Sequence, residues 1–145
     1  MSRSRMLPLI GALLGAAALP LLAVPASGAA PAGPHIVARP DNVMVNTKTT
    51  LIGRNFTPDT TIRLLECSQK TWIVPEDPCA NGNAVTVATN AKGAFRTQMT
   101  AEVCPGVPST PPPGFAEHCY IGQPVPQGID TITLVGAVRI TVTGP

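Results

Sequence analysis

The stretch that decides the fold is TIRLLEC, residues 61–67. Its apolar side chains recur with a period of two, which places Ile62 and Leu64 on one face of an extended strand. Leu65 and Cys67 then point to the other face. A period of 3.6, which a helix requires, is absent from this stretch. The sequence therefore predicts a strand that ends at a cysteine.

The same period of two recurs along the chain between turn signals rich in Gly, Pro, Asn and Asp. The chain contains 17 Pro and 13 Gly, whose even scatter argues against long helices. Short strands are expected at residues 35–39, 49–53, 61–67, 83–89, 94–103, 118–122 and 136–143. This spacing predicts an all-β fold, namely a seven-stranded antiparallel immunoglobulin-like β-sandwich.

The amino end has the pattern of a secretory signal peptide. Arg3 and Arg5 precede an apolar run at residues 6–24, and small residues follow at 26–30. Prolines interrupt the apolar run and no basic cluster follows it, which argues against a permanent membrane anchor. Residues 1–29 are therefore predicted to be a cleaved signal peptide, and residues 30–145 to form one domain.

Export has consequences for location and charge. The mature protein is expected to be a secreted, extracellular monomer without a membrane span, and retention at the cell envelope stays open. Arg3 and Arg5 leave with the signal peptide, so eight basic residues balance eight acidic ones. The remaining Lys and Arg residues are not clustered in the sequence, which argues against direct binding of nucleic acid.

Four cysteines, an even number, indicate a disulfide framework in an oxidising compartment. Three pairings are possible. Sequential pairing is favoured, because each sequential pair brackets a loop rich in Pro or Gly that could close on itself. No two cysteines have the short spacing of a zinc site, so no metal is expected. The four residues are Cys67, Cys79, Cys104 and Cys119.

The sequence contains few residues that could form a catalytic site. His35 and His118 are the only candidate imidazole bases, one near the amino arm and one beside a cysteine. The adjacent carboxylates Glu76 and Asp77 lie in a loop bounded by prolines and are expected to be solvated. We therefore expect a protein that is not an enzyme and that uses no cofactor.

Four fragments, in this order, resemble the neocarzinostatin family of small secreted actinomycete proteins that carry enediyne chromophores. The fragments are Gly53-x-x-Phe56 through to Cys67, Cys79 through to Gly93, Cys119-Tyr120-Ile121-Gly122, and Gly136 through to Thr141. The resemblance implies the seven-stranded fold, both sequential disulfides and the lack of an obligatory catalytic site. It also implies a cleft for an apolar ligand next to the first disulfide.

The chain departs from the family at that cleft. Leu65 replaces a family glycine, and Ala84 replaces a family aromatic residue. Trp72 lies in the first disulfide loop, where it is expected to be exposed. One interpretation is a reshaped pocket in which Trp72, Phe115 and Tyr120 surround an apolar polycyclic small molecule. The alternative is a cleft filled by Leu65, leaving a module that contacts a protein partner of the cell envelope.

Overall fold

The computed structural model describes residues 32–106 and 112–144, so the predicted signal peptide lies outside the described residues. The described chain is all-β, as predicted, and contains no helix. Its strands are β1 (His35–Arg39), β2 (Asn42–Met44), β3 (Lys48–Arg54), β4 (Thr61–Cys67), β5 (Thr71–Ile73), β6 (Cys79–Ala88), β7 (Phe95–Thr100), β8 (Ala116–Pro126) and β9 (Thr131–Thr143).

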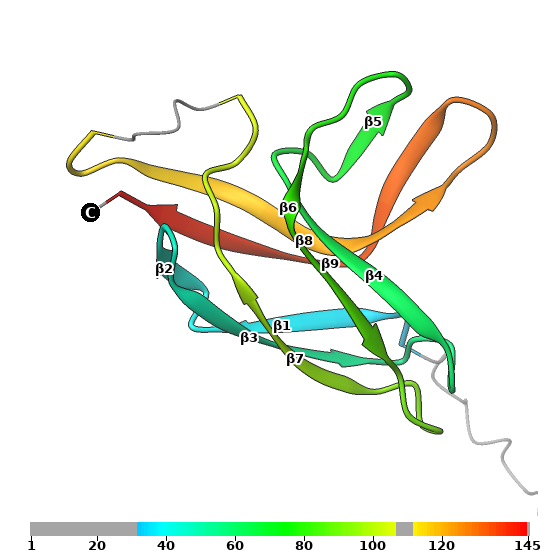
Figure 1. The fold of residues 1–145 in the computed structure, drawn as a ribbon. Coiled ribbons are helices and arrows are strands. Elements are labelled where there is room, and N and C mark those ends of the chain that lie inside the picture. Colours follow the sequence, from blue (N-terminus) through cyan, green and yellow to red (C-terminus); the bar gives the residue numbers. More distant parts are fainter. Residues whose placement is uncertain (1–31, 107–111, 145) are drawn as a thin grey trace, which may run out of the picture.

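The strands form two packed layers that are joined through β9. The hydrogen-bonded order is β6-β4-β8-β9-β1-β3-β7, and β2 and β5 also pair with β9. Figure 1 shows β1, β3 and β7 forming one layer, while β4, β6, β8 and β9 form the other. The hydrophobic core lies between the two layers, because the strands turn one apolar face inwards.

Two parts of the predicted architecture are wrong. The structure has nine strands where seven were expected, and β1 and β2 both pair with β9 in parallel. Both additional strands, β2 and β5, are three residues long. A strand of three residues is too short for a period of two to be recognised, and a sequence pattern carries no information on strand direction.

A β-bulge divides the long hairpin of β8 and β9. Ile121 pairs with Val138, whereas Gln123 pairs with Val135, so the register shifts between these two pairs. Between them β8 contributes the single residue Gly122, while β9 contributes the two residues 136–137. An extra residue on one strand bends it and increases its twist.

The bulge turns β9 from one face of the sheet to the other. Leu134, before the bulge, belongs to a second hydrophobic cluster, whereas Ile140 and Val142, after it, belong to the main core. Gly136 has a φ of 67°, in the left-handed region that favours glycine. One strand can therefore contribute to two separate apolar clusters.

Two aromatic rings occupy the main core. Phe56 and Phe95 are both buried, and their ring centroids lie 5.3 Å apart. A Cβ atom placed on Gly53 would come within 1.9 Å of the Phe95 ring, and one on Gly136 within 2.6 Å of the Phe56 ring. The two glycines therefore leave the space that the rings fill.

Both predicted disulfides are confirmed. Cys67 pairs with Cys79 and Cys104 pairs with Cys119, so no cysteine is free. The first bond belongs to the second hydrophobic cluster, whereas the second bond lies in the main core. Each apolar cluster thus contains one covalent cross-link.

Candidate binding site

The second hydrophobic cluster lies on the opposite face of β4 from the main core. Ile62 and Leu64 belong to the main core, and Leu65 and Cys67 belong to the second cluster. This division is the one that the alternation in TIRLLEC predicts. The second cluster includes the Cys67–Cys79 disulfide, beside which the sequence led us to expect a cleft.

Trp72 is buried in this cluster, so the expectation that it lies on an exposed loop is wrong. The disulfide loop returns over the sheet and forms β5, in which Trp72 pairs with Ile132 of β9. Hydroxyl groups of Thr71 and Thr133, which are also paired across these strands, lie 3.2 Å apart. Trp72 is only 5% exposed, because the pairing of β5 with β9 places its side chain in the second cluster.

Four of the five predicted site residues meet at the second cluster. Leu65 and Trp72 are buried members, while Ala84 and Tyr120 are partly buried and pack against it. Phe115 precedes β8 and lies five positions before Tyr120, which corresponds to roughly 17 Å along a strand. The structure therefore does not bring Phe115 to the other four residues.

The position of the expected cleft is filled by the protein's own side chains. Leu65 is 7% exposed and Leu134 is 3% exposed, and both belong with Trp72 to the same cluster. Leu134 was not anticipated as a neighbour of this site, although the alternation at residues 131–135 could have indicated a strand there. The buried side chains beside the first disulfide are therefore Leu65, Trp72 and Leu134.

An exposed apolar surface lies beside this filled cleft. We call Ile73, Val74 and Ile129 the aliphatic tip; their exposed fractions are 60%, 48% and 97%. The backbone N–H of Val74 donates a hydrogen bond of 2.7 Å to the carbonyl of Asp130, which joins the end of β5 to the β8–β9 turn. The three side chains therefore belong to one end of the molecule.

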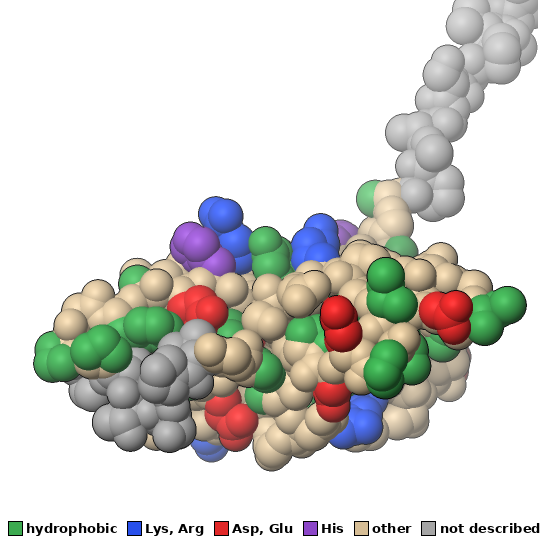
Figure 2. All heavy atoms as spheres, turned by 90° about the horizontal axis from the view of Figure 1, so that it is seen from above, with side chains coloured by type: hydrophobic (Ala, Val, Ile, Leu, Met, Phe, Trp, Pro, Cys, Tyr) green, Lys and Arg blue, Asp and Glu red, His purple; other side chains and the backbone are tan. Residues whose placement is uncertain are grey.

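The aliphatic tip is bordered by acidic side chains. Glu76, Asp77 and Asp130 are all exposed and follow the tip residues closely in the chain. Figure 2 shows hydrophobic side chains with acidic ones between them at the end of the molecule where β5 and the β8–β9 hairpin project. Apolar and acidic side chains are thus interspersed on this surface.

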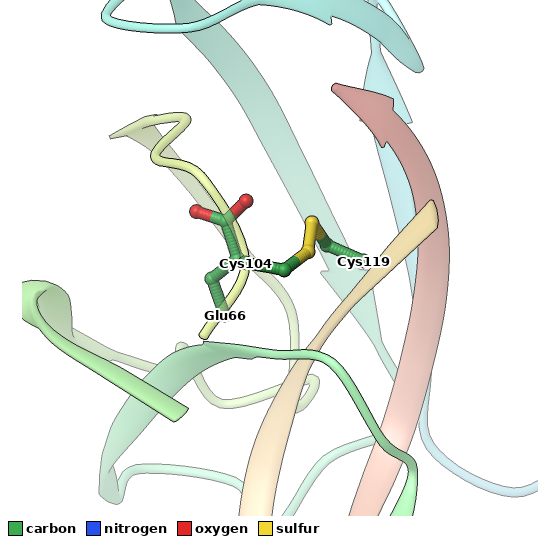
Figure 3. Close-up of side chains that lie close together, drawn as sticks. All are labelled: Glu66, Cys104 and Cys119. Carbon is green, nitrogen blue, oxygen red and sulfur yellow. A yellow bond between two sulfur atoms is a disulfide. The ribbon is translucent and has the colours of Figure 1, made fainter. Parts of the chain in front are cut away.

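Glu66 is a buried carboxyl that the sequence did not single out as structural. Its side chain is fully buried and approaches the Cys104–Cys119 disulfide (Figure 3). Its Oε2 accepts a hydrogen bond from the Asn83 amide and one of 3.0 Å from the backbone N–H of Glu102. Burial raises its pKa to about 7, which the two hydrogen bonds only partly oppose.

Glu66 and the two sulfur atoms do not form a metal centre in this state. Sulfur binds metals as a thiolate, and both sulfur atoms beside Glu66 are in a disulfide. Within the described ranges, neither Oε1 of Glu66 nor Oδ1 of Asn83 has a hydrogen-bond partner. A protonated Glu66 fits this apolar position better than a carboxylate does.

The two histidines lie on different strands and both are exposed. His118 Nδ1 lies 3.2 Å from the Thr141 hydroxyl, and His35 Nδ1 lies 3.4 Å from the carbonyl of Gly33. Among the hydrogen bonds of the described residues, neither ring contacts a carboxylate that could orient it as a catalytic base.

The part of the chain that the structure describes has no helix of the length and apolar character that a membrane span needs.

Comparisons with known proteins found one fold likeness. No family model matches the chain, and no curated protein matches its sequence. The solved structure of macromomycin is similar, with 16% sequence identity and a TM-score of 0.48. The alignment covers 77% of this chain and 99% of that one. A likeness of this size carries no functional argument.

Proposed function

We propose that this chain is a secreted, non-enzymatic interaction module whose aliphatic tip contacts another protein outside the cell or in its envelope. The observation that carries the proposal is the burial of Trp72, at 5% exposed, over the first disulfide. This side chain and Leu65 are buried beside the disulfide, where the family resemblance implies a ligand. Their burial supports a protein that contacts its partner through exposed side chains instead.

The aliphatic tip has the chemistry of a contact surface. Isolated exposed aliphatic residues are common, but three that gather at one projecting end favour association with a partner. Ile129 is 97% exposed and would gain most from burial at an interface. The acidic side chains of Glu76, Asp77 and Asp130 favour a partner whose contact surface has both apolar and basic side chains.

Secretion is the second part of the proposal. The pattern of charge, apolar run and small residues at 1–29 supports export. The two disulfides support it independently, because such bonds persist mainly in oxidising compartments. The amino end of the mature protein, determined from a culture of an exporting bacterial host, tests this part; recovery of uncleaved chain in the cell fraction alone would reject it.

Site-specific crosslinking tests the contact surface. A photoreactive residue placed at Ile129 is expected to capture one protein in cells of the source, whereas the same residue at Val37, 41% exposed on β1, is not. Titration of the purified partner then measures affinity. Ile129→Asp should weaken it at least about tenfold, as expected for a central apolar contact. Equal affinity for the variant would show that the aliphatic tip is not the interface.

A second candidate function is the carriage of an apolar small molecule, and one observation favours it. Leu65, Trp72, Ala84 and Tyr120 converge beside the first disulfide, where the family resemblance implies a ligand. Entry of a ligand would require β5 to move away from β9. Fluorescence of Trp72, the only tryptophan, reports this directly on titration with naphthalene derivatives. Leu65→Ala should strengthen saturable binding, and no response in either protein would reject the carrier.

A further inference from the structure

An open groove lies away from both the second cluster and the aliphatic tip. It has a volume of about 790 Å³ and lies where β3 and β7 meet the end of β6 and the turn that follows it. Its lining includes three cations, Arg54, Lys92 and Arg96, and includes no carboxylate. Lys92 and Arg96 are near each other in the sequence, whereas Arg54 is distant from both, so the fold brings Arg54 to the other two.

Strand pairing places two of the three cations on the same face of the sheet as one apolar side chain. Ile52 of β3 stands directly opposite Arg96 of β7, and cross-strand partners share one face of a sheet. Arg54 lies two positions beyond Ile52 and therefore on the same face. Both arginines are exposed, while Ile52 is half-buried.

A rigid turn holds the third cation. The side-chain oxygen of Asn90 accepts hydrogen bonds from the backbone N–H groups of Lys92, at 2.9 Å, and of Ala94, at 3.0 Å. The backbone N–H of Phe56 donates to the carbonyl of Gly93 at 3.0 Å, which attaches the turn to the opposite loop. The backbone that carries Lys92 is therefore fixed before any ligand arrives.

The groove combines these charges with apolar lining. Ile52 and Ala94 contribute hydrophobic atoms to it, and Asn55 and Asn90 contribute amides. Its volume falls within the range of small-molecule sites, roughly 300–1,000 Å³. Guanidinium groups bind carboxylate, sulfate and phosphate groups through paired hydrogen bonds.

We propose that this groove binds a small organic anion, with a carboxylate, sulfate or phosphate head group placed between Arg54 and Arg96 and an apolar body against Ile52. Lys92 supplies a third positive charge at the turn. This ligand is distinct from the protein partner proposed for the aliphatic tip and from the apolar ligand considered for the second cluster.

Amide chemical shifts of the whole ¹⁵N-labelled mature protein test the proposal with three probes. Decanoate, below its micellar concentration, should produce saturable shifts at residues 52–55 and 88–96. Decyltrimethylammonium has a similar apolar chain and the opposite charge, and it should bind at least about tenfold more weakly. Inorganic phosphate tests whether the charge alone is sufficient, and it should also bind more weakly than decanoate.

Charge variants locate the site. The double variant Arg54→Gln with Arg96→Gln should weaken decanoate binding at least about tenfold, because it removes two charge-assisted contacts. Arg139→Gln, at an exposed position of β9 outside the groove, should leave it unchanged. If the double variant loses its dispersed spectrum, Lys92→Gln serves instead and should weaken binding about threefold.

Three results would overturn the proposal. These are equal binding of the cationic and anionic probes, binding of inorganic phosphate as tight as that of decanoate, and shifts confined to the aliphatic tip or the second cluster. None of them bears on the protein partner, whose test uses Ile129.

Discussion

Trp72 pairs with Ile132 across the ladder of β5 and β9, and this pairing carries the indole over the Cys67–Cys79 disulfide. The indole thereby lies in the buried cluster beside that disulfide, together with Leu65 and Leu134. Burying an aromatic side chain contributes roughly 1.5–3 kcal/mol to stability relative to leaving it exposed. Any ligand for this position must first displace that contact.

Trp72→Ala should therefore destabilise the fold strongly. Truncation of a buried aromatic side chain removes its burial and leaves a cavity, which together cost about 3–5 kcal/mol. Ile73→Ala, at a neighbouring position that is 60% exposed, should cost less than about 1 kcal/mol. Urea denaturation of both variants measures the difference. Similar losses in the two variants would contradict the burial of Trp72.

The stability of the protein should fall between about pH 4.5 and pH 7 because of Glu66. Its pKa is about 7 in the fold, against an ordinary value of 4.5 for the carboxyl group, so in this range the unfolded chain loses a proton that the folded chain keeps. Stability therefore decreases as pH rises, by about 3 kcal/mol in total. Below this range the carboxyl is protonated in both states, and above it the loss is complete.

Glu66→Gln tests this dependence, because an amide cannot titrate. Urea denaturation across the pH range should give a flatter stability profile for the variant than for the wild type. Glu76→Gln, at an exposed loop position, should retain the wild-type slope. Parallel profiles for the wild type and Glu66→Gln would show that another group is responsible.

Gly136→Ala should destabilise the bulge in β9. A Cβ at this position would lie 2.6 Å from the Phe56 ring, and the residue has a left-handed backbone conformation. The combined strain should cost about 1–3 kcal/mol. Gly33→Ala is the control, because nothing lies within 4 Å of an added Cβ there. Thermal unfolding followed by circular dichroism compares the two, and equal midpoints would exclude the strain.

The cysteine pairing can be checked directly. Peptide mapping without reduction should recover a Cys67–Cys79 fragment and a Cys104–Cys119 fragment. Removing either bond, by a double substitution with alanine, should cost about 3 kcal/mol, because the cross-link limits the unfolded chain. Fragments that connect the first pair of cysteines to the second pair would contradict the structure.

Regular strands were predictable from the sequence, and the residues that interrupt them were not. β1 and β4 have the predicted bounds, because turn residues mark an end of each: Pro40 and Asp41 follow β1, and Pro58 and Asp59 precede β4. In β9 the predicted strand began at Gly136, whereas the observed strand begins five residues earlier, at Thr131. The bulge at Gly136 changes the phase of the alternation between apolar and polar residues. The sequence pattern therefore does not identify the segments before and after Gly136 as one strand.

The candidate site was predicted in part. The alternation placed Leu65 and Cys67 on the face opposite Leu64, and the structure has them there. The position of Trp72 depends on a three-residue strand that pairs with a hairpin 60 residues further along the chain, Trp72 with Ile132. The groove beside Arg54 and Arg96 depends on the pairing of β3 with β7. Such contacts between distant segments leave no local pattern in a single sequence.

The central role of β9 has a consequence for how the protein acquires its structure. β9 pairs with β1, β2, β5 and β8, so strands from the start, middle and end of the domain all depend on it. While the ribosome is still adding residues 131–143, the earlier strands lack this shared partner. Long-range pairing of this kind delays closure of the native sheet. The ribosome must therefore complete β9 before the two layers can assemble. Until then the nascent chain cannot form the complete native sheet.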